Sequence, residues 1–387
     1  MKSKQLFVLA VLVVVLGIAS ILLLRSEHSS WQAPSAAGTR VLAEFDPNAV
    51  ARVEIKNKDG SVVLTRREDK WTVEQSSGYP ANFERISGLI RRLWDLKSVQ
   101  EVAAGPSQFA QLELVEPAEG KSDTGTVISL EDASGKRLTA LLAGKTHMQA
   151  PPGFPGDGYA AGRYLMALDG KNRVVLVSDL FDETRQPAKD WLERDFLRIA
   201  NPKSITLKGP NREWSLTREN PSEPWKLANG VVPEAGKAGS IVAALGVPSF
   251  DDVSADESAF DFSEPDTLTV QTTDGFTYTW TIGRQKDDTY PVKIAINGDF
   301  PKERTPAEDE KPEDKEKLDE AFAKEREALE KRLAEEKRFE KWIYRIPATT
   351  LSSILVSEKD LQPPTPTQDQ TSEKTPEQAP DPIPDTP

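Results

Sequence analysis

Residues 61–74 read SVVLTRREDKWTVE, and residues 213–227 read EWSLTRENPSEPWKL. Both stretches contain Leu-Thr-Arg, then charged or polar residues, then a tryptophan, one further residue and an aliphatic side chain. Alternating apolar residues predict β-strands around the first stretch, and Asp59-Gly60 predicts a hairpin turn just before it. The pair indicates either a reactive motif used twice or a structural unit built twice.

Further matches follow the two stretches in one order. Residues 83–96 have apolar side chains at helical spacing, and residues 236–253 take the same place in the second half. Residues 125–144 correspond to 266–283, and the ends of the two halves correspond as well. Matches in one order indicate internal duplication. We therefore predict an α+β fold, a tandem duplication of an antiparallel-sheet-plus-helix unit, whose repeat-equivalent structural residues are Trp71, Trp225, Pro117 and Pro265.

The amino-terminal segment is basic and then continuously apolar. Lys2 and Lys4 precede an uncharged run over residues 6–24, bounded by Leu6 and Leu24. A helix rising about 1.5 Å per residue crosses most of a hydrocarbon core roughly 30 Å thick over such a run. A cleaved signal peptide has a shorter apolar region, of about 7 to 15 residues. The sequence therefore predicts that the fold is preceded by one transmembrane helix, an uncleaved signal-anchor with its amino terminus in the cytoplasm.

Composition divides the chain into five segments. The second segment is rich in small and polar residues, and the last is rich in proline and poor in aliphatic residues. We expect an N-terminal transmembrane anchor (1–25), a tether (26–42), a first α+β repeat (43–200), a second α+β repeat (201–361) and a disordered, Pro-rich acidic tail (362–387).

The second repeat carries a charged insertion at about residues 299–340. Its strong helix formers and closely spaced opposite charges predict a long exposed helix. The apolar residues of this helix form a narrow stripe, whose members are Leu318, Phe322, Leu329 and Leu333. One interpretation is a partner-binding stripe that pairs with another helix, as in a coiled coil. The alternative is a charged surface helix that only promotes solubility.

The chain resembles a family of bacterial single-anchor envelope proteins known as domain of unknown function 4340, here in tandem repeat form. The resemblance rests on the basic start and single apolar span, the strand pair leading to Trp71, the helix over 83–96 and the block FAQLELVEPAEG at residues 109–120. The second half has its own version of the block, SAFDFSEPDTLTV, at residues 258–270. Glu113 and Asp261 stand where the family has glycine. The resemblance implies partners among ABC-type export systems with auxiliary subunits, and it implies no activity.

Several kinds of chemistry lack their usual residues. The formal net charge of −13 argues against a nucleic-acid partner. The chain has no cysteine and two histidines, His28 and His147, which leaves little for zinc or for a Ser-His nucleophile. The acidic stretch over residues 250–262 lacks the spacing of a calcium-binding EF-hand loop. We predict no catalytic, metal or cofactor-binding residues, no cofactor and no enzymatic activity.

These observations favour a membrane-anchored periplasmic scaffold or accessory subunit that binds a protein partner, in an ABC-type transport or envelope-export complex. The expected location is the bacterial inner membrane, single-pass, with the body in the periplasm. An alternative function is a tethered binding module for an envelope glycan or peptide ligand. A third, weaker alternative is a carboxylate-based hydrolase, because the chain has 62 acidic residues.

Overall fold

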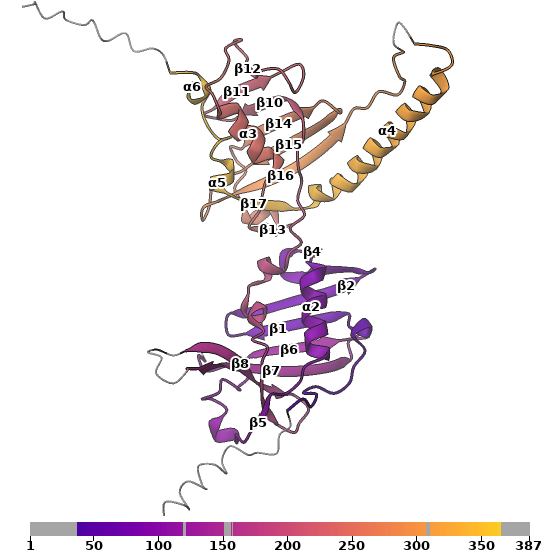
Figure 1. Cartoon of the computed structure of the whole chain (residues 1–387). Coiled ribbons are helices and arrows are strands. Elements are labelled where there is room, and N and C mark those ends of the chain that lie inside the picture. Colours follow the sequence, from indigo (N-terminus) through magenta and orange to yellow (C-terminus); the bar gives the residue numbers. More distant parts are fainter. Residues whose placement is uncertain (1–36, 119–120, 151–155, 157, 307–309, 365–387) are drawn as a thin grey trace, which may run out of the picture.

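The computed structural model describes residues 37–118, 121–150, 156, 158–306 and 310–364 (Figure 1). The predicted membrane span over residues 6–24, with its ends Leu6 and Leu24, lies outside these described residues, as does most of the predicted tail. Among the described helices, none combines the length and the apolar character that crossing a bilayer requires.

Two large antiparallel sheets dominate the described chain. The first has nine strands in the order β4-β3-β2-β1-β6-β7-β8-β9-β5. Its strands are β1 (Arg52–Asn57), β2 (Gly60–Arg67), β3 (Lys70–Val73), β4 (Tyr79–Pro80), β5 (Gln100–Val102), β6 (Thr126–Glu131), β7 (Arg137–Gln149), β8 (Tyr159–Ala167) and β9 (Val174–Val177).

The second sheet has eight strands in the order β12-β11-β10-β14-β15-β16-β17-β13. Apart from the extra edge strand β4, the two sheets follow one strand order. The strands of the second sheet are β10 (Pro202–Lys208), β11 (Glu213–Thr217), β12 (Lys226–Leu227), β13 (Asp252–Ser254), β14 (Asp266–Thr272), β15 (Phe276–Ile282), β16 (Thr289–Gly298) and β17 (Ile343–Pro347).

The two stretches that share Leu-Thr-Arg occupy the same place in their sheets. Leu64 of β2 lies opposite Val73 of β3, and Leu216 of β11 lies opposite Leu227 of β12. Both leucines are fully buried, because alternate residues of each strand face the core. The shared letters therefore mark a strand pair in each sheet rather than a reactive motif.

The helices are few and mostly short. They are α2 (Phe83–Trp94), α3 (Lys237–Gly246), α4 (Lys315–Glu336), α5 (Ala348–Leu351) and α6 (Glu358–Leu361). Single 3-10 turns complete the described elements: η1 (Pro47–Ala49), η2 (Glu74–Ser76), η3 (Pro106–Gln108), η4 (Asp182–Arg185), η5 (Ala188–Trp191), η6 (Glu257–Ala259) and η7 (Lys337–Lys341). The Asn82 side chain caps α2 by accepting a hydrogen bond of 2.9 Å from the Arg85 backbone N–H.

The predicted fold class is wrong. The described chain is mostly sheet, with few helices, whereas we expected α+β units preceded by a transmembrane helix, and no helix among the described residues could span a membrane. The helix α2 lies between β4 and β5, and α3 lies between β12 and β13, within sheets of nine and eight strands. The helical spacing of the apolar residues predicted α2 correctly. This helix makes up only a small part of the first unit.

Aromatic side chains join the two sheets where β4 of the first meets the β13 side of the second (Figure 1). The ring of Tyr79 in β4 lies 4.8 Å from that of Trp342 and 5.6 Å from that of Phe250, measured between centroids. Burial raises the pKa of Tyr79 to about 12, so this phenol stays neutral at ordinary pH. Lys189 and Asp251 form an ion pair of 2.8 Å across the same junction. One continuous apolar core therefore runs through both sheets.

Candidate functional site

The predicted stripe on α4 is divided between the interior and the surface. Leu329 and Leu333 pack against the core, and Phe322 lines a groove of about 330 Å³ together with Phe300. Leu318, nearer the start of the helix, is 41% exposed. The structure thus brings three members of the stripe onto the sheet and leaves Leu318 in solvent.

The carboxyl-terminal half of α4 is fixed to the sheet by one arginine. Arg332 pairs with Asp274 at 2.8 Å and with Glu336 at 2.7 Å, and it donates a hydrogen bond of 3.0 Å to the Tyr278 hydroxyl. Its guanidinium also lies 4.3 Å from the centroid of the Phe276 ring, within range of a cation–π contact. These contacts all lie in the second half of the helix, so the first half projects from the sheet (Figure 1).

Of the residues predicted to be structural, the two tryptophans lie at corresponding places in the two sheets and the two prolines do not. Trp71 of β3 is buried, and Trp225, just before β12, is half-buried beneath the Arg218 guanidinium at 4.4 Å. Pro265 immediately precedes β14, whereas Pro117 lies several residues before β6. Both prolines are half-buried.

His147 and the acidic stretch over residues 250–262 form hydrogen bonds and ion pairs with other side chains of the chain. His147 lies in β7 rather than in a loop, and its Nδ1 atom is 3.0 Å from the Tyr164 hydroxyl. In the acidic stretch, Asp251 pairs with Lys189, and Glu257 pairs with Lys293 at 2.7 Å. In the described part of the chain, no group of three or more histidine and acidic side chains is arranged to hold a metal ion.

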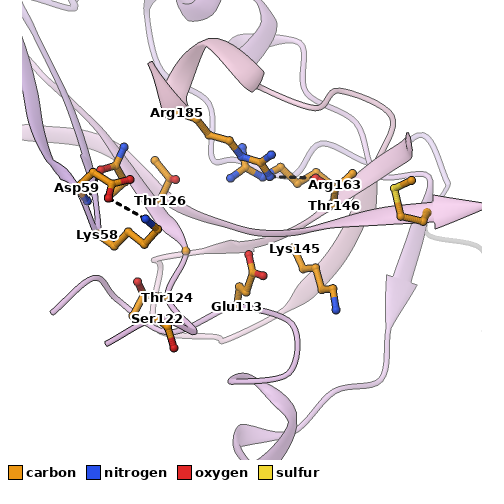
Figure 2. A pocket seen from close by; sticks show the side chains of 13 residues that line it. Lys58, Asp59, Glu113, Ser122, Thr124, Thr126, Lys145, Thr146, Arg163 and Arg185 are labelled. Atoms are coloured by element: carbon orange, nitrogen blue, oxygen red, sulfur yellow. Dashed lines mark hydrogen bonds and ion pairs between the residues drawn. The ribbon is translucent and has the colours of Figure 1, made fainter. Parts of the chain in front are cut away.

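A polar pocket at one end of the first sheet was not predicted from the sequence. It has a volume of about 440 Å³ and lies among the β1–β2 turn, the start of β6, β7, β8 and η4 (Figure 2). That volume falls within the range of about 300 to 1,000 Å³ that is usual for small-molecule sites. Its basic residues are Lys58, Lys145, Arg163 and Arg185, against the acidic residues Asp59 and Glu113. The lining therefore carries an excess of positive charge.

Arg163 is the buried member of this group. It is 2% exposed and donates hydrogen bonds to the backbone carbonyls of Gly144 at 2.8 Å and Leu180 at 3.0 Å. Burial lowers the pKa of Arg163 to about 10, and the nearby charge of Arg185 acts in the same direction. Among the described residues, no carboxylate lies within 4.0 Å of this guanidinium. The carbonyl dipoles stabilise the charge without neutralising it.

An irregularity in β7 creates the space. The pairing of β7 with β8 shifts between Ala143 and Thr146, so Gly144 and Lys145 bulge from the ladder. A loop packs tightly on this bulge, because a Cβ atom at Gly144 would lie 2.3 Å from the Leu112 carbonyl oxygen. Glu113, the next residue of that loop, has φ of 53°, which places a non-glycine residue in the left-handed region. Figure 2 shows its side chain turned toward β7.

Hydroxyl groups complete the lining. Arg185 donates a hydrogen bond of 2.9 Å to Thr146 Oγ1 and lies beside Arg163 (Figure 2). Thr124, 8% exposed, lines the pocket, and its Oγ1 atom is buried with no hydrogen-bond partner in the described structure. A buried hydroxyl without a partner is energetically unfavourable.

The sequence contained one signal for this pocket. The strand registers give Arg163 of β8 the position that Tyr290 has in β16, so the first half has a basic residue where the second has an aromatic one. In the structure, Pro291 and Phe262 contact Gly283 at the corresponding corner of the second sheet. Among the described residues, Arg163 is the one arginine that is buried. A position-by-position comparison of the two halves would have identified it.

The comparisons with known proteins give a family and no activity. A family model described as Domain of unknown function (DUF4340) matches residues 71–269, from β3 of the first sheet into β14 of the second. No curated protein matches the chain. No solved structure matches it either.

Proposed function

Since the chain belongs to the DUF4340 family, whose description names no activity, we propose that it is a non-enzymatic scaffold or accessory subunit that binds a protein partner. The proposed contact surface is the outer half of α4, residues 315–325. The observation that carries the proposal is the incomplete packing of this helix. None of its residues is buried, and Leu318 on its apolar stripe is 41% exposed.

The partner that suits this surface is an amphipathic helix. Leu318 is exposed, and Phe322, four residues on, is half-buried in the groove that Phe300 lines, so both lie on one face of α4 with charged residues on both sides. A narrow apolar stripe of this kind fits the apolar face of one other helix, and the flanking charges give register and orientation. The mixed signs of those charges favour a protein helix over a phosphate-rich surface.

The finer assignment is an ABC-type transport or envelope-export complex. It is supported by what the family resemblance implies, and by the apolar run over residues 6–24 of the sequence. Placement of the body in the periplasm of a bacterium stays a prediction, because that run lies outside the described residues.

Matched charge insertions on α4 test the proposed surface. Leu318→Lys places a charge on the stripe, whereas Ala323→Lys makes the same charge change about 140° around the helix. Both sites are exposed, so both variants are expected to fold with unchanged circular dichroism. We expect Leu318→Lys to abolish partner recovery in a pull-down from the cells that make the chain, and Ala323→Lys to retain it. Equal recovery with the two variants would contradict the proposed contact surface.

A second candidate function is a binding module for an envelope glycan or peptide. The observation that favours it is the pocket beside β7 and β8, with its buried arginine and its unpartnered Thr124 hydroxyl. Binding of purified peptidoglycan fragments to the full-length chain tests this function. Loss of that binding in Arg185→Gln would assign it to the pocket.

A further inference from the structure

The pocket of the first sheet has the electrostatics of an anion site. Four basic side chains line it against two acidic ones, and Lys58 pairs with Asp59 at 2.7 Å, which leaves three basic side chains against Glu113. Arg163 brings a buried positive charge that no carboxylate within 4.0 Å neutralises in the described chain. A buried charge is stabilised by an opposite charge, and the bulge in β7 leaves room for one beside it.

The hydrogen-bond donors that line the pocket, like its positive charge, suit an anionic ligand. The buried Thr124 Oγ1 atom has no partner and can donate its proton to an oxygen atom in the pocket. Arg185 is exposed, donates one hydrogen bond to Thr146 and forms a solvent-exposed ion pair of 3.8 Å with Asp182, so its remaining N–H groups can reach a ligand. A guanidinium and a hydroxyl together match an oxyanion, which only accepts hydrogen bonds.

Glu113 supplies a carboxylate of the protein itself at the same place. Its charge is among those that act on Arg163, and the loop that carries it is held against Gly144 and Gly125. A non-glycine residue at φ of 53° is conformationally unfavourable, so the tight packing of the loop holds Glu113 there. In the ligand-free protein, this carboxylate offsets part of the positive charge and would compete with an incoming anion.

We propose that this pocket binds the oxyanion group of a small ligand, a carboxylate or a phosphate, through Arg185 and the Thr124 hydroxyl, with Arg163 providing a fixed positive charge behind them. The proposal rests on the second candidate function and names the ligand chemistry. The other hydroxyls of the lining, Ser122 and Thr126, suit a ligand that also carries hydroxyl groups, such as an acidic or phosphorylated sugar.

Isothermal titration of the full-length chain tests the proposal. The probes are inorganic phosphate and D-glucuronate, at constant ionic strength set with chloride, and uncharged D-glucose is the neutral control. We expect one-to-one saturable binding of at least one anion and none of glucose. Binding of phosphate alone, or of glucuronate alone, would identify which oxyanion the pocket prefers.

Variants with opposite expected effects make the test specific. Arg185→Gln should weaken anion binding by roughly tenfold, because a charge-assisted hydrogen bond is lost, and Thr124→Val should weaken it by about threefold. Glu113→Gln should tighten binding several-fold, because the competing charge is removed. Arg284→Gln, on the surface of the second sheet, is the matched control and should bind like the wild type.

Three results would overturn the proposal. One is the absence of saturable binding of either anion, and another is equal binding by Arg185→Gln and Arg284→Gln. The third is weaker binding by Glu113→Gln. If both anions fail while peptidoglycan fragments still bind, the oxyanion proposal is wrong and the second candidate function stands. If Arg185→Gln does not fold, the anion-binding constants of Thr124→Val and Glu113→Gln test the proposal. Weaker binding by the first and tighter binding by the second would support it, and the opposite changes would contradict it.

Discussion

At the residue scale, two buried threonines near the pocket, Thr124 before β6 and Thr184 in η4, differ in their hydrogen bonds. The Thr124 hydroxyl has no hydrogen-bond partner, whereas the Thr184 hydroxyl donates to the Phe181 carbonyl at 2.7 Å. Replacing Thr124 with valine removes an unsatisfied polar atom, so we expect the free energy of unfolding to rise by about 1 kcal/mol. Replacing Thr184 with valine breaks a buried hydrogen bond and should lower it by about 1 to 3 kcal/mol. Urea denaturation of the ligand-free chain measures both changes.

The two variants have similar shapes and opposite expected signs. A loss of stability in Thr124→Val equal to that in Thr184→Val would show that the Thr124 hydroxyl has a structural partner. In that case the hydroxyl could not be counted as a free donor in the pocket.

Single residues were predictable from the sequence where a local pattern determines them. Leu64 and Leu216 follow strand alternation, and both are buried as core residues should be. Arg163 and Thr124 are different, because a bulge in β7 and a loop from outside the sheet produce their environment. No spacing within the sequence encodes such contacts, although comparing Arg163 with Tyr290 between the two halves would have drawn attention to the site.

At the element scale, α4 is joined to the second sheet mainly through Arg332. Replacing Arg332 with leucine would leave Asp274 and Glu336 without their cation, so we expect the free energy of unfolding to fall by about 1 to 3 kcal/mol. The neighbouring Lys331→Gln is the control, because its pair with Glu335 at 4.0 Å is solvent-exposed and should contribute less than about 0.5 kcal/mol.

Hydrogen exchange locates the effect of the Arg332 variant. We expect faster exchange along the carboxyl-terminal half of α4 in Arg332→Leu, and exchange like the wild type in Lys331→Gln. Unchanged protection of this half in Arg332→Leu would mean that Leu329 and Leu333 hold the helix without the arginine.

The bounds of α2 and α4 were predictable from the spacing of their residues, whereas the tertiary contacts of these helices were not. The expected helix over residues 83–96 is α2 (Phe83–Trp94), and the long charged helix is α4 (Lys315–Glu336) followed by a 3-10 turn. The sequence could not show which members of the stripe face the sheet, because Phe300 and Gly298 meet them from a distant part of the chain. Stripe positions follow from helical geometry, whereas docking depends on tertiary contacts.

At the scale of the whole molecule, two sheets with one strand order share a continuous core. The predicted fold class is wrong because nine strands in the first half and eight in the second outnumber the helices α2 and α3, which the helical spacing indicates. The junction was also not predictable, since Tyr79, Phe250 and Trp342 lie far apart in the sequence and meet only after both sheets form. The two halves differ in features outside the shared strand order. The first half has the polar pocket beside β7 and β8, and the second half has the projecting helix α4.

The most direct test of the proposed function is photo-crosslinking in the cells that make the chain. A photoreactive amino acid is placed at position 318 in one full-length variant and at position 323 in another. We predict that position 318 yields one discrete adduct with a protein partner, and that position 323 yields none. Adducts of the same size and amount from both positions, or no adduct from position 318, would contradict a partner-binding surface on α4.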